Sequence, residues 1–234
     1  MVDYASKLQQ LQYNIAESAD KAGRNPEDIK IVAVSKTRGV QEIEAVLELG
    51  INNLGENRVQ EFKDKYDLLE ERDISWHMVG HLQRNKVKYL MRRKRCTMIQ
   101  SLDSLRLAKK IEGEAAKEER SIDVLVQVNQ ADDPNKYGFQ PQEVLSFLQE
   151  LKGFSRLRVR GLMTILPYVD DPEEVRPYFS QLSLLRDQIR AEKMEWINMD
   201  CLSMGMTNDY QVAIEEGATM IRIGTAIFGP RQEE

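Results

Sequence analysis

The sequence predicts an α/β protein folded as a single (β/α)8 barrel of the TIM type, with an extra helix at its N-terminal end. Short apolar runs alternate with helix-period stretches eight times, and the crossovers are long enough for parallel strand pairing. The length of 234 residues is close to that of one such barrel. An open sheet would leave edge strands, and no Gly-x-Gly-x-x-Gly motif follows any expected strand. We therefore expect one domain spanning 1–234, with the barrel from about 30 to 230.

The elements can be placed in order along the chain. An amphipathic helix over about 3–22 comes first, because its apolar residues share one helical face. Strands are expected at 31–35, 52–55, 75–80, 97–100, 122–129, 157–163, 200–203 and 219–223. Helices are expected over about 40–49, 58–71, 84–93, 172–192 and 208–216, with one ending near 119 and one starting at 141. Proline favours a first helical turn at Pro141, and Gly217 is placed to end the last helix.

Composition excludes several classes of partner. The net charge of −5 gives no global basic field for nucleic acid. No run approaches eighteen apolar residues, and the first ten residues lack the apolar core of a signal peptide. Cys96 and Cys201 have no metal-type spacing and are expected to be free thiols in a reducing compartment. We expect a cytoplasmic protein with no membrane partner, no nucleic acid and no metal site.

Lys36 follows the first buried strand directly and is the first candidate for chemistry. Residues 31–35 are apolar or small, so a charged group at their carboxyl end is costly unless it has a partner or a function. A desolvated lysine amine is suited to attack an aldehyde and form a Schiff base. The alternative is that the side chain of Lys36 extends into solvent.

In a barrel of this type, functional side chains lie at the carboxyl ends of the strands. These ends are rich in hydroxyls, glycines and cations, and the set contains no carboxylate pair, Ser-His-Asp arrangement or metal cluster. The candidates are Lys36, Glu56, Asn57, His81, Gln83, Asn129, Lys136, Ser203, Gly205, Thr207, Arg222, Gly224 and Thr225.

Two segments, 203–207 and 223–226, have the features of a phosphate site. Glycines permit close backbone approach, and free amides at helix starts favour an anion. Loops after the seventh and eighth strands commonly bind phosphate in this fold. These glycines could instead serve only tight turns. Barrel closure makes the eighth and first strands neighbours. A phosphate site in these two segments, together with the amine of Lys36, predicts a phosphorylated aldehyde as ligand.

Five motifs resemble those of the pyridoxal phosphate homeostasis proteins, single-domain relatives of the alanine racemase N-terminal barrel. They are 34–37 (VSKT), 55–61 (GENRVQE), 76–86 (WHMVGHLQRNK), 203–206 (SMGM) and 221–229 (IRIGTAIFG). The resemblance implies that Lys36 carries pyridoxal 5′-phosphate (PLP) as a Schiff base and that Arg222 faces the pyridine nitrogen. It implies a monomer with a role in vitamin B6 and amino-acid homeostasis. The cofactor-binding set is then Lys36, Asn57, Ser203, Gly205, Thr207, Arg222, Gly224 and Thr225.

Arginine donates hydrogen bonds and stays charged, so Arg222 would keep the ring nitrogen unprotonated and weaken the ring as an electron sink. The related racemases also use a tyrosine from a second domain, which we do not expect in a chain ending at Glu234. We therefore expect a PLP carrier that supplies apo-enzymes, with at most slow transamination or racemisation and no catalytic residue. The alternatives are a PLP-dependent racemase of unknown substrate and a Schiff-base aldolase acting on a sugar phosphate.

Several smaller features stay open at this point. Lys136 is either a second cation near the cofactor or a solvated loop residue, and His81 lies either beside the ring or at the start of the next helix. Met206 borders the predicted site, whereas His77 alternates within a strand and is expected to be structural. The basic helix over 84–95 presents either a solvated face or a docking surface for an anion or a protein.

Overall fold

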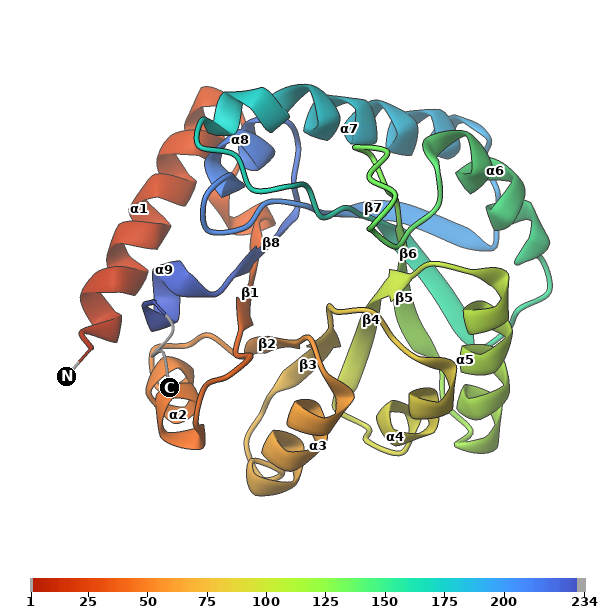
Figure 1. Cartoon of the computed structure of the whole chain (residues 1–234), viewed down its shortest axis with the longest axis horizontal. Helices are drawn as coiled ribbons and strands as arrows, with labels where there is room; N and C mark the ends of the chain where they lie inside the picture. Colours follow the sequence, from red (N-terminus) through yellow and green to blue (C-terminus); the bar gives the residue numbers. More distant parts are fainter. Residues whose placement is uncertain (1, 231–234) are drawn as a thin grey trace.

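The computed structural model describes residues 2–230, and its eight parallel strands close into a barrel in chain order (Figure 1). The predicted fold class is therefore confirmed. The strands are β1 Lys30–Val34, β2 Asn53–Glu56, β3 Ser75–Met78, β4 Cys96–Leu102, β5 Ile122–Gln127, β6 Leu157–Met163, β7 Ile197–Ser203 and β8 Met220–Ile223.

Helices surround this barrel on the outside (Figure 1). The α-helices are α1 Tyr4–Lys21, α2 Val40–Leu47, α3 Val59–Leu68, α4 Val87–Met91, α5 Leu105–Lys117, α6 Pro141–Glu150, α7 Arg176–Ala191, α8 Tyr210–Glu215 and α9 Thr225–Phe228. Three short 3-10 helices are η1 Pro26–Asp28, η2 Arg84–Lys86 and η3 Pro172–Val175. No helix in the described part of the chain is both long and apolar enough to cross a membrane.

The N-terminal helix α1 lies along α8 and α9 (Figure 1). Asp3 caps its start, because a side-chain oxygen of Asp3 accepts a hydrogen bond from the amide of Ser6 at 3.0 Å. Its apolar face is buried in the main core, as its sequence period predicts. The side-chain amide of Asn14 also donates to the hydroxyl of Tyr210 in α8 at 2.9 Å. The extra helix thus covers the segments where the barrel closes.

Pairing between β1 and β8 closes the barrel and fixes the level of its first and last loops. Val32 pairs with Arg222, and Ala33 pairs with Ile223. Because both strands run in the same direction, the loop that carries Lys36 lies beside the loop that carries Gly224 and Thr225. Residues almost 190 positions apart in the chain are therefore neighbours at the carboxyl mouth of the barrel.

The apolar core has two parts. The larger part packs the outer faces of the strands against the helices, and its largest fully buried side chains include Trp76, Phe62, Phe179 and Phe228. A separate cluster lies inside the barrel, where successive strands contribute inward-facing residues. Its members are Val32, Val79, Met98, Leu125, Met163 and Met220. This inner cluster forms an apolar base under the barrel mouth.

Some predicted boundaries are wrong. The strand at 200–203 begins earlier, at Ile197, and the short helix α9 was not predicted. The basic helix ends at Met91 because the guanidinium of Arg120 donates to the carbonyls of Met91, Arg93 and Cys96. Among these, the carbonyl of Met91 is one that another helical turn would have used.

The glycine at position 161 gives a test of the barrel wall. A Cβ atom there would lie 1.8 Å from the carbonyl oxygen of Cys201 on the neighbouring strand β7. Gly161→Ala should therefore lower the free energy of unfolding by about 2 kcal/mol or more. Gly113, inside α5, has no atom within 4 Å of such a Cβ. Gly113→Ala should raise stability by about 0.5–1 kcal/mol. Urea unfolding of both variants checks this, and equal effects would contradict the close packing of β6 on β7.

Candidate functional site

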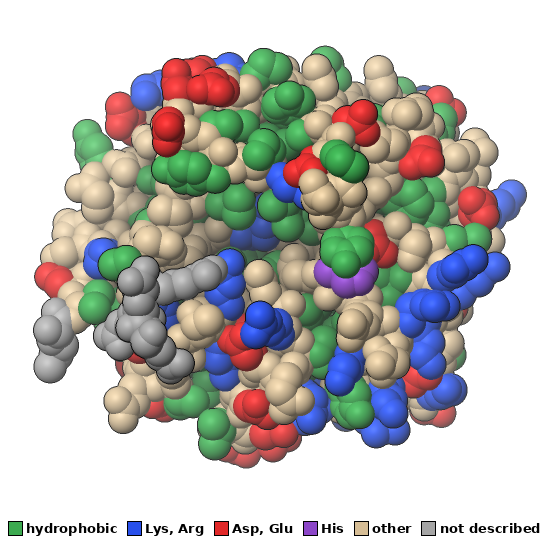
Figure 2. Space-filling view, viewed as in Figure 1, with side chains coloured by type: hydrophobic (Ala, Val, Ile, Leu, Met, Phe, Trp, Pro, Cys, Tyr) green, Lys and Arg blue, Asp and Glu red, His purple; other side chains and the backbone are tan. Residues whose placement is uncertain are grey.

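A cavity of about 540 Å³ opens at the carboxyl ends of the strands, and we call it the Lys36 cavity. Lys or Arg side chains are visible deep in the hollow at the middle of this face (Figure 2). The structure brings most of the predicted residues together here. Those that line it are Lys36, Asn57, Met206, Thr207, Arg222, Gly224 and Thr225.

Lys36 lies in a turn rather than at the strand end. The strand β1 stops at Val34, and Lys36 follows two residues later as a half-buried side chain. Thr37 has a φ of 63°, the left-handed region that residues with a Cβ rarely adopt. Such a conformation persists only where surrounding contacts hold it.

A buried ionic cluster supplies those contacts. Lys65 in α3 donates through Nζ to the carbonyl of Ser35 at 2.6 Å and to Oε1 of Glu56 at 2.6 Å. It also forms an ion pair with Oε2 of Glu61 at 3.4 Å. The same Glu61 oxygen accepts the backbone amide of Thr37 at 2.8 Å. The cluster therefore holds the backbone on both sides of the cavity lysine.

Arg222 places a buried cation at the inner end of the Lys36 cavity. Its Nη1 donates to Oγ of Ser203 and its Nη2 to the carbonyl of Thr164, both at 2.7 Å. Burial lowers the pKa of Arg222 to about 10, so the guanidinium is still charged at neutral pH. Ser203 donates in turn to Oε1 of Gln100 at 2.6 Å, and the amide of Gln100 lies 2.9 Å from Nδ1 of His77.

His77 is the inner end of this chain of hydrogen bonds. It is completely buried, and burial lowers the pKa of His77 to about 3. The imidazole is therefore neutral at physiological pH, and its Nδ1 can accept from the Gln100 amide. This agrees with the structural role predicted for His77. It also means that Arg222 is oriented by neutral partners.

The loops after β7 and β8 contact each other, and the β7 loop also packs on α8. Oγ1 of Thr207 accepts the amide of Ala226 at 3.3 Å, which ties the two loops together. A Cβ on Gly205 would lie 2.7 Å from the Cβ of Ala213 and 2.9 Å from the Cα of Tyr210. Gly205, with a φ of 90°, is therefore required for close packing of its loop on α8.

Seven predicted residues are not among those that line the Lys36 cavity. Glu56 is fully buried in the Lys65 cluster, and Gln83 lines another pocket. Asn129 is buried, and its side-chain amide donates to the carbonyl of Asp133 at 2.9 Å.

Ser203 is fully buried in the Arg222 network, and Gly205 packs on α8. His81 lines a separate pocket. Lys136 lies in the loop after β5, where its Nζ is 3.8 Å from Oδ2 of Asp133 and burial lowers its pKa. Direct contact of these seven residues with a ligand in the cavity stays a prediction.

The sequence reasoning missed Arg38, Tyr168 and Asp209, which also line the cavity. Arg38 follows Lys36 closely, and its Nη2 donates to the carbonyl of Gly229 at 2.6 Å. Asp209 accepts the amide of Met206 at 2.6 Å, and burial raises the pKa of its carboxyl. Tyr168 is in the long loop after β6, which has no motif that could have marked it.

The sequence is similar to known proteins over almost its whole length. The family described as "Alanine racemase, N-terminal domain" matches residues 6–232. The pyridoxal phosphate homeostasis protein of Aquifex aeolicus is 41% identical over 226 residues, covering 97% of each chain. The chain belongs to the pyridoxal phosphate homeostasis protein family.

Solved structures of similar proteins share this fold along nearly the whole chain. A protein of unknown function from Bifidobacterium adolescentis has a TM-score of 0.88 at 32% identity, covering 97% of both chains. PipY of Synechococcus elongatus, solved with PLP bound, has a TM-score of 0.80 at 31% identity. That comparison covers 92% of this chain and all of PipY.

The ionic cluster around Lys65 can be tested by removing its cation. Lys65→Met leaves the fully buried Glu56 without a counter-charge, so the free energy of unfolding should fall by about 3 kcal/mol. Lys63→Met, on the same helix, removes an ammonium that lies over the Tyr89 ring and should cost less than about 1 kcal/mol. Urea unfolding at pH 7 compares the two variants. Similar losses would show that the cluster does not hold the loop.

Burial of neutral His77 predicts a pH dependence of stability. Its folded pKa of about 3 lies below the ordinary 6.5, so the unfolded chain binds more protons between these values. The stability due to neutral His77 is present above pH 6.5 and is lost as pH falls, by about 2 kcal/mol between pH 7 and pH 5. In His77→Gln this component should be absent when unfolding is measured at both pH values.

The chain has only one other histidine, which supplies the control. His81→Gln removes an imidazole outside the barrel interior and should keep the loss that His77 causes. An unchanged pH dependence in His77→Gln would contradict the buried neutral imidazole.

Proposed function

We propose that this protein binds PLP in the Lys36 cavity through a Schiff-base linkage to Lys36 and acts in the homeostasis of PLP and amino acids. The observation that carries the proposal is that the amine of Lys36 and the guanidinium of Arg222 line one cavity in a homeostasis-family chain. PipY, the similar protein with PLP bound, supports the choice of ligand.

The donor set of the cavity fits PLP. An aldehyde requires an amine, which Lys36 provides, and the phosphate requires hydrogen-bond donors. The hydroxyls of Thr207 and Thr225 and the backbone at Gly224 lie at the mouth formed by the β7 and β8 loops. The register of β1 on β8 sets these groups beside Lys36. Asn57 adds an amide from the β2 side.

Bound PLP would supply an aldehyde for covalent attachment and a pyridine ring that can accept electrons. The protein's own groups limit that second property. Arg222 remains a cationic donor at neutral pH, because its pKa is about 10. If the pyridine nitrogen faced Arg222, this guanidinium would donate a hydrogen bond to it and keep it unprotonated. The buried Arg222 therefore favours a carrier of the cofactor over a catalyst.

The same proposal includes the setting in which the protein acts. We infer a monomer, because the exposed large apolar side chains of residues 2–230 come from separate segments of the chain. Both cysteines are free thiols, which fits a reducing cytoplasm. The recipients of the cofactor are proposed to be apo-enzymes that depend on PLP.

The test is borohydride reduction of the protein after incubation with PLP, followed by mass mapping of the modified lysine. A yellow protein whose reduced adduct maps to Lys36 is the expected result. Lys36→Ala should lose the adduct and keep cooperative unfolding, because the side chain lies in a turn outside the packed core. Lys136→Met is the matched control, since Lys136 does not line the cavity and its loss should leave the Lys36 adduct in place.

Two outcomes would overturn parts of this proposal. Absence of any adduct would remove PLP as the ligand. Turnover of an amino acid that Lys36→Ala abolishes would replace the carrier by a racemase or related enzyme.

A further inference from the structure

We propose that a second pocket at the barrel mouth binds a small phosphate-bearing ligand, independently of the Lys36 cavity. This pocket, which we call the His81 pocket, has a volume of about 700 Å³. No residue that lines it lines the Lys36 cavity. Its size suits a small metabolite, since such sites range over roughly 300–1,000 Å³.

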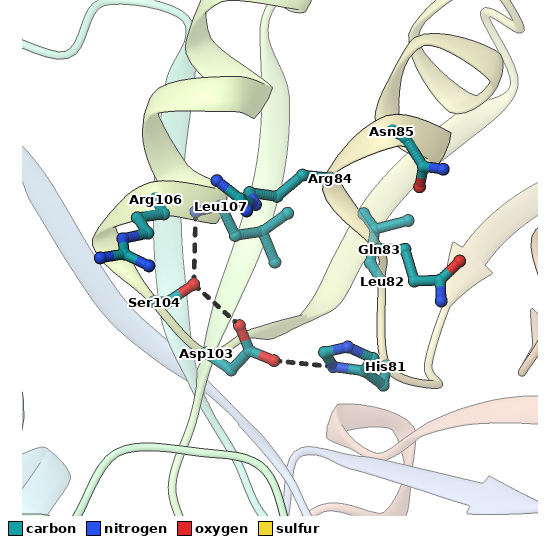
Figure 3. A pocket seen from close by; sticks show the side chains of 9 residues that line it. All are labelled: His81, Leu82, Gln83, Arg84, Asn85, Asp103, Ser104, Arg106 and Leu107. Carbon is teal, nitrogen blue, oxygen red and sulfur yellow. Dashed lines mark hydrogen bonds and ion pairs between the residues drawn. The ribbon is translucent and has the colours of Figure 1, made fainter.

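Two neighbouring strand ends build the pocket from opposite sides (Figure 3). One wall is the segment after β3 that enters η2, with His81, Arg84 and Asn85. The other wall is the end of β4 and the start of α5, with Asp103 and Arg106. The carboxyl ends of parallel strands face the mouth of the barrel, so this pocket opens on the functional side of the fold.

His81 is held in a fixed orientation although it is partly exposed. Its Nδ1 lies 2.9 Å from Oδ2 of Asp103, and its ring stacks on Tyr137 at 3.6 Å with planes 10° apart. The other oxygen of Asp103 accepts Oγ of Ser104 at 3.1 Å. With Nδ1 donating to Asp103, Nε2 is the ring nitrogen left for a ligand, and it donates to a phosphate oxygen when the imidazole is protonated. The side chain of His81 is 35% exposed, yet residues from two other segments hold its ring. A histidine that served only as a solvated surface residue would not need both contacts.

Two arginines supply uncommitted positive charge. The side chains of Arg84 and Arg106 have no hydrogen bond or ion pair with any residue between 2 and 230. By contrast, Arg93 on the same basic segment is bidentate to Asp67. The single acidic side chain in the pocket, Asp103, is already engaged.

These groups match the chemistry of a phosphate. Two guanidinium groups from different elements can each bind a different pair of oxygens on one tetrahedral phosphate. A planar carboxylate has only two oxygens and cannot satisfy both groups as well. The start of α5 adds backbone amides, of which that of Leu107 is capped by Ser104 at 3.3 Å. Lys and Arg side chains also gather on the α4 and α5 side of this face (Figure 2). They would raise the local concentration of an anion.

The test is titration of the 15N-labelled protein with inorganic pyrophosphate at about 0.15 M salt, where distant surface charges are largely screened. The expected result is a saturable shift of the amide resonances of residues 104–107. The amides of 224–226 report the Lys36 cavity separately, so binding there is distinguished from binding in the His81 pocket. Citrate serves as the carboxylate probe and should bind at least tenfold more weakly.

A double variant and its matched control decide between a site and a general charge effect. Arg84→Gln with Arg106→Gln should weaken pyrophosphate binding at 104–107 by at least tenfold. Lys94→Gln with Lys109→Gln removes the same charge from α5 and the adjacent basic segment, outside the pocket, and should change affinity less than twofold. Equal losses in both pairs, shifts confined to 224–226, or citrate binding as tight as pyrophosphate would each overturn the proposal.

Discussion

Closure of the barrel between β1 and β8 is the constraint on which the functional geometry depends. The pairing of Val32 with Arg222 sets the depth of a buried cation relative to the turn that carries Lys36. A slip of one residue would turn Arg222 out of the barrel, because side chains alternate between the two faces of a strand. The helix α1 packs over α8 and α9 beside this junction and adds apolar burial where first and last strands meet. Stability and function therefore use the same contact.

The charged groups around the Lys36 cavity are separated by function. The Lys65 cluster lies behind the turn and holds backbone atoms of Ser35 and Thr37. Arg222 lies in the barrel interior, where neutral partners fix its guanidinium. Buried ion pairs cost desolvation energy, so they add little stability compared with apolar packing. The contribution of the Lys65 cluster is geometric, since it holds the left-handed turn at Thr37. The neutral partners of Arg222 likewise fix the position of that cation.

The sequence was sufficient for the barrel and for most of the cavity because both depend on local signals. Apolar β-branched runs mark the strands, and a barrel directs their carboxyl ends to one mouth. Ser203 is different: it is the last residue of β7, and its hydroxyl donates to Gln100 on β4, about a hundred residues away in the chain. The early end of the basic helix depends on Arg120, which lies 27 residues along the chain from Arg93. Such contacts have no local pattern.

His81 illustrates the same limit. Its motif allowed a place beside the ring or at the start of the next helix. The structure gives it partners from two other segments, Asp103 after β4 and Tyr137 after β5. Neither is marked by spacing, since each lies more than twenty residues from His81. Only the order of the strands around the barrel brings these three side chains together.

Further polar side chains line the Lys36 cavity beside Lys36 and Arg222. Arg38 is tied to the carbonyl of Gly229, and Asp209 is tied to the amide of Met206. Tyr168 is the remaining lining side chain, apart from Lys36 itself, of the type that serves as a base. It is 76% exposed, and no hydrogen bond from any residue within 2–230 orients it. A catalytic base must be held within hydrogen-bond reach of the proton it removes. The Lys36 cavity thus combines an amine on a backbone turn held by the Lys65 cluster with a cation fixed by neutral partners.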